Sequence, residues 1–230
     1  MRALVGNRLP NFTVIQSKMV KGSLDFLGVN YYTARYADDS TSSSSVNPSY
    51  TTDSHVNLTK PKTPSSWLFI YPRGIQELIL YVEKNFNNPP IIITENGFSD
   101  VNNNSWTIQD ALNDSLRLKY HQLHLSSLLK ATRARINVKG YYVWSFLDDF
   151  EWESGYTYRF GINYIDYKNG LTRYMKHTAL WFKKFLQREN LTTRVNCKKY
   201  ELVPSIFQTK LILSLTSEPK VKIQLKRQIN

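Results

Sequence analysis

The chain has 230 residues, of which 30 are Lys or Arg and 18 are Asp or Glu, so its formal net charge is +12. Its hydrophobic content of 41% is ample for a packed core, and no apolar run approaches the roughly 18 residues of a membrane-spanning helix. The single cysteine, Cys197, excludes an intramolecular disulfide framework, and the sequence places no metal-ligand cluster beside it. We therefore expect a globular protein with no metal and no cofactor.

The positive charge is concentrated at the C-terminus, because residues 191–230 supply six of the twelve net charges. Elsewhere it is spread thinly, which argues against a nucleic-acid-binding surface. Residues 1–10 lack the apolar segment of an export signal, so no signal peptide is predicted. Five Asn-x-Ser/Thr sequons give a mild hint in the opposite direction. The sequence therefore leaves the localisation and the oligomeric state open.

The first half of the chain predicts a strand, a long loop and a helix. Residues 24–32 form an apolar and aromatic run that indicates a buried strand. Residues 37–66 are rich in Ser, Thr, Pro and Asn, which predicts a loop throughout. Residues 73–86 have the spacing of an amphipathic helix. The side chains of that helix expected to face the core are Ile75, Leu78, Ile79, Val82 and Phe86.

The second half repeats strands and helices. Residues 89–95 and 138–146 predict two more strands, and the unbroken isoleucines of the first suit a parallel strand buried on both faces. Helices are expected over 107–132 and 172–186. Their predicted inward residues are Ile108, Leu112, Leu116, Tyr120 and Leu123 in the first, and Tyr174, Thr178, Trp181, Phe182 and Phe185 in the second. This alternation predicts an α/β fold with parallel strands and about three β/α units.

Glu95 stands where the second predicted strand ends, and the turn-forming pair Asn96–Gly97 follows it. Active sites of parallel α/β barrels lie at the carboxyl ends of the strands, so a carboxylate fixed at a strand tip is a candidate catalytic group. An ordinary exposed glutamate at a strand end explains this feature alone equally well.

Residues 143–161 strengthen the catalytic interpretation, because they combine carboxylates with aromatic rings in a short span. Such a mixture suits a pyranose, whose C–H groups stack on an indole while its hydroxyls donate to carboxylates. The first predicted strand ends in Asn30 and Tyr32, and a phenol that donates to a carboxylate would orient it. The residues of the span that stand out are Trp144, Asp148, Asp149, Phe150, Glu151, Trp152, Tyr156, Tyr158 and Phe160.

Several long motifs resemble the C-terminal half of family 1 glycoside hydrolases, especially the plant β-glucosidase branch with its cyanogenic and defence glucosidases. They are "RLPNFT" at 8–13, "FLGVNYYTARY" at 26–36, "ITENG" at 93–97 and the continuous stretch 138–174. The resemblance implies that residues 1–188 form strands six to eight, with their helices, of an incomplete (β/α)8 TIM barrel. Residues 189–230 fall outside it and are expected to be a basic, poorly ordered extension.

The resemblance also implies roles for individual residues. Glu95 matches the nucleophile of a retaining mechanism, Tyr32 the tyrosine that hydrogen-bonds it, and Asn30 a neighbour of both. The implied partner is a β-glucoside. The implied substrate-binding residues are Asn30, Trp67 at the aglycone, Trp144 beneath the sugar ring, Glu151 and Trp152 at its O4 and O6 hydroxyls, and Phe160 in the same aromatic group. Asp149 stands where many relatives have Asn, and Glu153 where many have an aromatic residue.

The second carboxylate of a retaining glycosidase lies about 5–5.5 Å from the nucleophile and acts as acid and base. In this family it belongs to an Asn-Glu-Pro motif, which is absent from the chain. We therefore expect strands one to five to be missing and the isolated chain to be marginally stable, prone to aggregate and inactive. A non-catalytic sugar-binding fragment and a family 1 transglucosidase remain open as alternatives.

Overall fold

The computed structural model describes residues 6–39, 55–59, 68–189 and 222–225. The chain divides into two compact units, one made of Met1–Asp25 with Thr33–Tyr71 and the other of Phe26–Tyr32 with Pro72–Asn230. Among the described residues, no helix has the length and apolar character needed to cross a bilayer.

The first unit contains short elements: η1 (Gly6–Arg8), α2 (Val14–Val20), β2 (Tyr36–Asp39) and β3 (Val56–Thr59). Thr13 begins α2 with a capping box, in which its hydroxyl accepts from the Gln16 amide and the Gln16 side chain accepts from the Thr13 amide. β2 and β3 pair antiparallel. The prediction that residues 37–66 are loop throughout is therefore wrong at these two strands, whose backbone groups satisfy each other despite their polar side chains.

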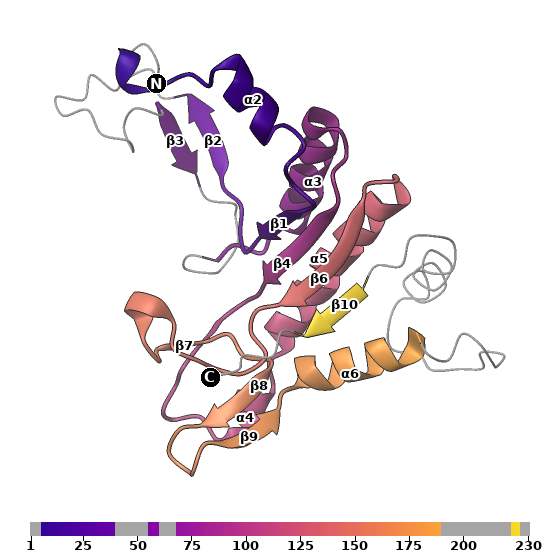
Figure 1. Ribbon diagram of the computed structural model, residues 1–230. Coiled ribbons are helices and arrows are strands. Elements are labelled where there is room, and N and C mark those ends of the chain that lie inside the picture. The colour runs from indigo at the N-terminus through magenta and orange to yellow at the C-terminus, as the bar shows by residue number, and fades with distance from the viewer. Residues whose placement is uncertain (1–5, 40–54, 60–67, 190–221, 226–230) are drawn as a thin grey trace. The chain divides into compact units, whose positions relative to one another are not determined.

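The second unit is built on a parallel sheet with the order β1-β4-β6-β10 (Figure 1). Its strands are β1 (Leu27–Asn30), β4 (Ile91–Asn96), β6 (Val138–Val143) and β10 (Lys222–Leu225). The first three confirm the predicted parallel strands, although each is shorter than expected. Within the described residues, β1 and β10 each have a single strand neighbour, so the sheet stays open with two edges.

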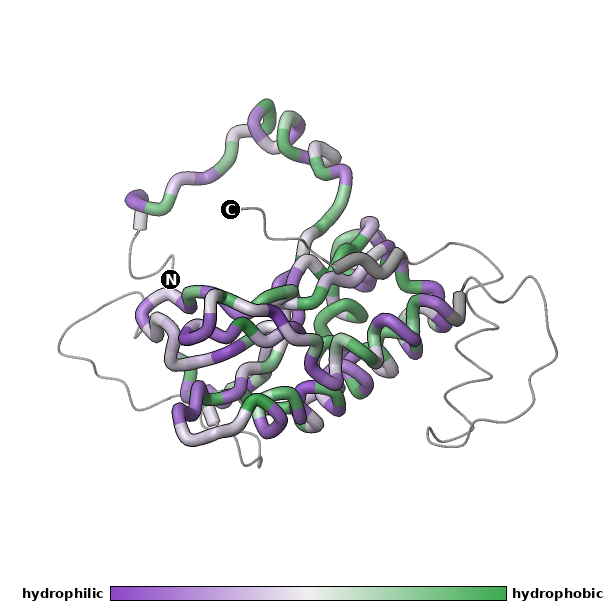
Figure 2. Tube along the Cα trace, turned by 90° about the horizontal axis from the view of Figure 1, so that it is seen from below, coloured by the Kyte–Doolittle hydropathy of each residue, from purple (hydrophilic) through white to green (hydrophobic). Residues whose placement is uncertain are grey.

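Helices α3 (Pro72–Phe86) and α5 (Ser115–Arg133) pack against each other along the sheet, and α6 (His177–Glu189) packs on α5 (Figure 1). Hydrophobic and hydrophilic stretches alternate along the helices in Figure 2, as expected of amphipathic segments. The predicted inward face of α3 is correct at its three buried residues, Ile75, Ile79 and Val82. Leu78 and Phe86 are 37% and 61% exposed, so their predicted burial is wrong.

The helix predicted over 107–132 is two helices, α4 (Ile108–Leu112) and α5, separated at Asp114. The Asp114 carboxylate accepts from the Thr178 amide and the Arg117 guanidinium, which fixes the break. The buried face of α5 is largely polar, since Arg117, Tyr120, His121 and His124 are all fully buried, whereas Leu116 and Leu123 are exposed. Hydrophobic spacing therefore identified the wrong face, apart from Tyr120.

Residues 172–175 are a strand, not the start of a helix. β9 (Thr172–Met175) pairs antiparallel with β8 (Asn163–Asp166), and α6 begins only at His177. Thr178 and Phe182 are buried as predicted. Three further short elements follow the sheet strands: β5 (Asp100–Val101), β7 (Tyr158–Arg159), which pairs with β5, and η2 (Trp152–Ser154). Most of the 189–230 extension lies outside the described residues.

Candidate active site

A β-bulge in β4 determines where Glu95 points. Along β1, Val29 pairs with Ile93 but the next residue, Asn30, pairs with Glu95. On the other side of β4, Ile93 pairs with Tyr141 of β6 and Asn96 pairs with Val143. A step of two residues along β6 therefore corresponds to a step of three residues along β4. β4 therefore contains one extra residue, and such a bulge changes the face on which the following side chains lie.

The bulge decides which face of the sheet each residue occupies: Glu95 lies on the face of Ile92, and Asn96 on the face of Ile91 and Ile93. Ile91 and Ile93 are fully buried, and so is Asn96, which contacts α5 through Tyr120. Glu95 is half-buried with Ile92 and Thr94. The predicted burial of this strand on both faces is thus wrong for the face that carries Glu95. Strict alternation would have placed the Glu95 carboxylate on the face of Ile91 and Ile93.

Tyr32 holds the Glu95 carboxylate, since its Oη donates to Glu95 Oε2 at 2.6 Å. The Tyr31 amide also donates to the Glu95 carbonyl oxygen at 2.9 Å, so the segment after β1 follows the tip of β4. Burial and the adjacent Glu95 carboxylate raise the pKa of Tyr32 far above its usual range. Tyr32 is therefore a neutral hydrogen-bond donor. The Phe160 ring meets it edge-on at a centroid distance of 6.0 Å.

Gly97, the residue after β4, lies too close to the end of β6 to carry a side chain. A Cβ at this position would lie 1.9 Å from the Trp144 carbonyl oxygen, so only glycine allows the two backbones to approach. The Trp144 amide donates to the Asn96 carbonyl oxygen at 2.9 Å. The tips of β4 and β6 are thereby joined at Asn96 and Trp144.

Glu151 is the second carboxyl group in this region, and it is only 8% exposed. Trp144 Nε1 donates to its Oε1 at 3.3 Å. Burial raises the pKa of Glu151 to about 8, and the hydrogen bond and charge of Asp149 and the charge of Glu95 act in the same direction. The Glu151 carboxyl is therefore largely protonated at neutral pH.

Buried ion pairs fix the loops that carry these groups. Arg117, with no exposed surface, donates to Asp100, Asp114 and the carbonyl oxygens of Phe98 and Arg159. Asp148 accepts from Arg159 at 2.7 Å and from Lys176 at 3.0 Å. These bonds tie the segment after β4 and the segment after β6 to the starts of α5 and α6.

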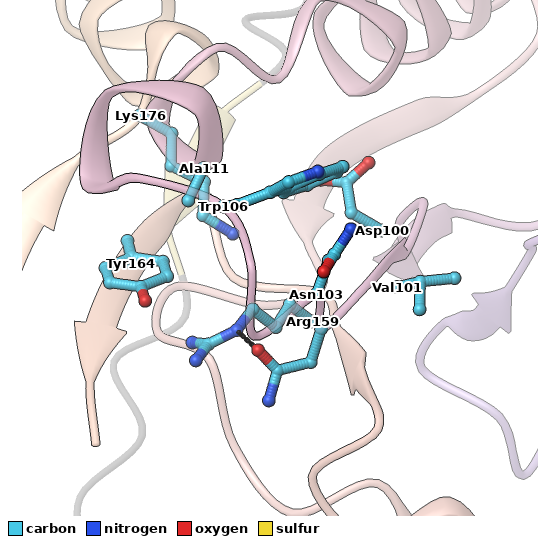
Figure 3. Close-up of a pocket in the computed structure, with 9 residues that line it drawn as sticks. Asp100, Val101, Asn103, Trp106, Ala111, Arg159, Tyr164 and Lys176 are labelled. Carbon is cyan, nitrogen blue, oxygen red and sulfur yellow. Dashed lines mark hydrogen bonds between the residues drawn. The ribbon is translucent and has the colours of Figure 1, made fainter. Parts of the chain in front are cut away.

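A small pocket lies beside this ion network, and Figure 3 shows Trp106, Arg159, Tyr164 and Lys176 around it. None of the residues that line the pocket is a predicted site residue. Arg159 Nε donates to Asn102 Oδ1 at 2.8 Å (the dashed line in Figure 3), and Lys176 is paired with Asp148. We therefore assign the pocket to the support of the loops. No group of three metal-ligating side chains occurs in the described part of the chain.

The remaining predicted site residues are less closely involved. Asn30 is exposed, and its Oδ1 accepts from Thr94 Oγ1 at 2.6 Å, beside the Glu95 backbone. Trp152 is 84% exposed. Trp67 lies outside the described residues. Sequence reasoning missed that Asn96, Tyr120 and Tyr141 interconnect behind Glu95. The available signal was the presence of two histidines, His121 and His124, close to Tyr120 in a predicted helix.

Comparisons with known proteins agree on one family. The profile of Glycosyl hydrolase family 1 matches residues 1–191. Beta-glucosidase 12 of Oryza sativa subsp. indica is 55% identical over 194 residues, which are 81% of this chain and 38% of the relative. Beta-glucosidase 17 of Arabidopsis thaliana is 51% identical over 198 residues, or 83% of this chain and 38% of the relative. The chain thus spans well under half the length of these relatives.

Solved structures give the same result. The crystal structure of a rice beta-glucosidase superposes with a TM-score of 0.72 at 40% identity, covering 79% of this chain and 40% of that one. A mutant rice beta-glucosidase, solved in a covalent complex with Glc, gives a TM-score of 0.71 at 42% identity, again over 79% and 40%. A beta-glucosidase from the fungus Humicola insolens, in complex with glucose, gives 0.71 at 35% identity, over 82% and 41%. The tyrosine-bound carboxylate at the tip of a parallel strand therefore belongs to a member of glycosyl hydrolase family 1.

Proposed function

We propose that the chain carries the nucleophile side of a retaining β-glucosidase site, with Glu95 as the nucleophile. The observation that supports this most directly is the 2.6 Å hydrogen bond from Tyr32 to Glu95 Oε2 at the end of β4. It orients the carboxylate and leaves Oε1 to attack. The covalent glucose complex of a rice relative supports the same chemistry. The sheet strands β1, β4 and β6 would then be strands six to eight of a (β/α)8 barrel, within a partial domain of residues 1–188.

The proposed reaction has two steps. Glu95 Oε1 attacks the anomeric carbon of a β-glucoside, the bond from that carbon to the aglycone oxygen breaks, and the electron pair leaves with the aglycone. Water then cleaves the glycosyl-enzyme. Trp144 would lie beneath the sugar ring. Glu151 would accept hydrogen bonds from the sugar hydroxyls, with Trp152 beside them. Asn30, Phe160 and Trp67 complete the proposed binding residues.

The acid/base group is proposed to lie outside these 230 residues, since the chain has no Asn-Glu-Pro sequence and spans only 38% of its relatives. An activated leaving group needs no general acid, so the first step would still proceed. The second step would be slow, because no base activates water. The chain would therefore react once and stop.

This proposal is tested by incubating the full chain with 2,4-dinitrophenyl 2-deoxy-2-fluoro-β-D-glucoside. We expect release of up to one equivalent of dinitrophenolate and, by mass spectrometry of peptides, one sugar attached to Glu95. Glu95→Gln is the matched control, because it keeps the size of the side chain and removes the nucleophile. Saturable sugar binding without an adduct would overturn the proposal and support a non-catalytic sugar-binding fragment.

Transglucosylation is separated in the same assay by adding acceptor alcohols to the labelled protein. Release of a new glucoside faster than hydrolysis would identify a transglucosidase. Sustained turnover of 4-nitrophenyl β-D-glucoside by the chain alone would contradict the proposal that the acid/base group lies elsewhere.

A further inference from the structure

A hydrogen-bonded cluster of fully buried polar side chains lies directly behind Glu95, on the face of the sheet that α5 covers. Its members are Asn96 on β4, Tyr141 on β6, and Tyr120 and His121 on α5, each at most 1% exposed. Asn96 Nδ2 approaches the Tyr31 carbonyl oxygen at 2.6 Å and Tyr120 Oη at 2.8 Å. The proposed reaction assigns no role to any of these groups.

The direction of each hydrogen bond in the cluster follows from its chemistry. The Tyr31 carbonyl can only accept, so the Asn96 nitrogen must face it and the Asn96 oxygen must face Tyr141. Tyr141 Oη therefore donates to Asn96 Oδ1 at 2.6 Å. Because the single Tyr141 proton is used there, His121 Nδ1, at 2.7 Å, must carry a proton and donate to Tyr141 Oη.

The other branch of the cluster leads to Tyr32. Tyr120 Oη accepts from Asn96 and donates to the Tyr32 carbonyl oxygen at 2.7 Å. Tyr32 in turn donates from its phenol to Glu95 at 2.6 Å. Asn96 is thus linked to both Tyr31 and Tyr32. It donates directly to the Tyr31 carbonyl oxygen, and it is connected to the Tyr32 carbonyl oxygen through the Tyr120 hydroxyl.

The cluster also favours one register of β4. Asn96 makes its three bonds only when the bulge before it places its amide on the α5 side, and this is the register that puts Glu95 on the opposite face. Without the bulge, the Asn96 amide would lose its bonds to the Tyr31 carbonyl and to the buried Tyr120 and Tyr141 hydroxyls, and losing hydrogen bonds at buried polar groups is costly.

We propose that Asn96 is a positioning residue for the nucleophile: it holds the β4 bulge that turns Glu95 toward the substrate, and through Tyr120 it holds the backbone of Tyr32. The proposal rests on the proposed function of Glu95. It predicts that bonds on the Tyr120 branch govern the reactivity of Glu95 more strongly than the bond from Tyr141, although both phenols are equally buried.

The experiment compares Tyr120→Phe with Tyr141→Phe in the full chain, since each removes one buried hydroxyl and no ring. Labelling by the 2,4-dinitrophenyl 2-deoxy-2-fluoro-glucoside gives the inactivation rate constant at saturation and the half-saturating concentration separately. We expect the rate constant to fall at least tenfold in Tyr120→Phe and only two- to threefold in Tyr141→Phe, with little change in half-saturation. For Asn96→Asp, which replaces the amide donors with an oxygen, we expect a loss of about 100-fold, the scale of an ångström-sized misplacement.

A purely structural role gives a different pattern. Loss of folded protein reduces the fraction of chain that can be labelled, whereas misplacement of Glu95 reduces the rate constant of the folded fraction. Equal rate constants in the two tyrosine variants, or an unchanged rate constant in Asn96→Asp, would overturn the proposal.

Hydrogen exchange is a second measurement, and it tests the positioning role of Asn96 without depending on the labelling of Glu95. If the wild-type chain is not labelled, the proposed function fails, and hydrogen exchange then decides the positioning role. The Tyr31 amide donates to the Glu95 carbonyl and the Trp144 amide to the Asn96 carbonyl. Faster exchange of both amides in Asn96→Asp, with smaller changes in Tyr141→Phe, supports the role; protection equal to wild type refutes it.

Discussion

The carboxyl group of Glu151 interacts with those of Asp149 and Glu95, and this crowding contributes to its raised pKa. Burial makes the largest contribution to its pKa of about 8, followed by the hydrogen bond and charge of Asp149. A carboxyl group whose pKa is higher in the folded state than its usual 4.5 lowers the stability of the fold as the pH rises from about 4.5 to about 8. Glu151 therefore lowers the free energy of unfolding at neutral pH, as expected of a residue whose role is binding and not stability.

We predict that Asp149→Asn lowers the pKa of Glu151 by roughly 1–2 units, because the like charge is removed and the acceptor of the hydrogen bond from the neutral acid becomes weaker. The titration of ¹³C-labelled glutamate carboxyl groups by NMR measures this directly. The control is Glu153→Gln, which removes a nearby exposed carboxylate and should leave the titration of Glu151 near pH 8. A Glu151 carboxyl that titrates near 8 in Asp149→Asn would contradict the pairing.

A second residue-scale prediction concerns Gly97. Gly97→Ala would place a methyl group on the Trp144 carbonyl oxygen, and the two strand tips would have to separate. We expect a loss of at least about 2 kcal/mol in the free energy of unfolding, measured with urea. Gly28→Ala is the matched control, because its Cβ would meet side chains and no backbone, the nearest being Thr94 at 3.2 Å. Similar losses in both variants would show that the close approach to Trp144 is not the cause.

At the scale of elements, the loops after β4 and β6 are held by buried charges as well as by apolar packing. Asp148 is the single acidic partner that Arg159 and Lys176 share among the described ion pairs, and all three are buried. Burial lowers the pKa of Lys176 to about 8, although Asp148 opposes this shift. Removing one member of such a cluster leaves an uncompensated buried charge.

Asp148→Asn is therefore expected to cost about 3–5 kcal/mol at pH 6. The loss should shrink toward pH 9, because Lys176 without Asp148 has a still lower pKa and becomes neutral, which removes one unpaired charge. Urea unfolding at both pH values measures the difference. Glu77→Gln breaks the exposed Arg73–Glu77 pair and should change stability by less than about 1 kcal/mol. A loss in Asp148→Asn that is the same at both pH values would contradict this account.

The elements also show what the sequence could and could not predict. The three strands and α3 were predictable, because runs such as Ile91–Ile93 and the spacing of Ile75, Ile79 and Val82 carry the information locally. The buried face of α5 was not, since its polar residues are satisfied by partners distant in the chain, such as Asn96. Tyr32 and Glu95 were identified by their motifs. The β4 bulge that sets the face on which Glu95 lies was not, because it depends on the register of β4 with its two neighbouring strands.

At the scale of the whole molecule, the chain exposes much apolar surface. Five apolar side chains of the first unit are at least 72% exposed: Phe12, Val14, Ile15, Met19 and Leu24. The parallel sheet of the second unit has open edges in its described part. Both features favour association between chains.

We predict that the double substitution Ile15→Lys with Met19→Lys reduces self-association without a loss of stability. Both side chains are more than 70% exposed, so their replacement should change the free energy of unfolding by about 0.5 kcal/mol or less. Light scattering at increasing concentration and the thermal midpoint measure the two effects. Ile79→Lys, at a fully buried position, is the contrasting variant and should not fold. Unchanged scattering in the double variant would direct attention to the sheet edges instead.

The bulge in β4 means that this strand contains one residue more than a regular strand would need to carry Glu95 on the same face as Ile92. Loss of a single codon at Thr94 would preserve the reading frame, the isoleucines and the Glu-Asn-Gly sequence, and strict alternation from Ile93 would then leave the glutamate on the face of Ile92 and the asparagine toward α5. A library of single-residue deletions, read out by labelling of the glutamate, would therefore show Thr94 to be among the more tolerant positions of β4.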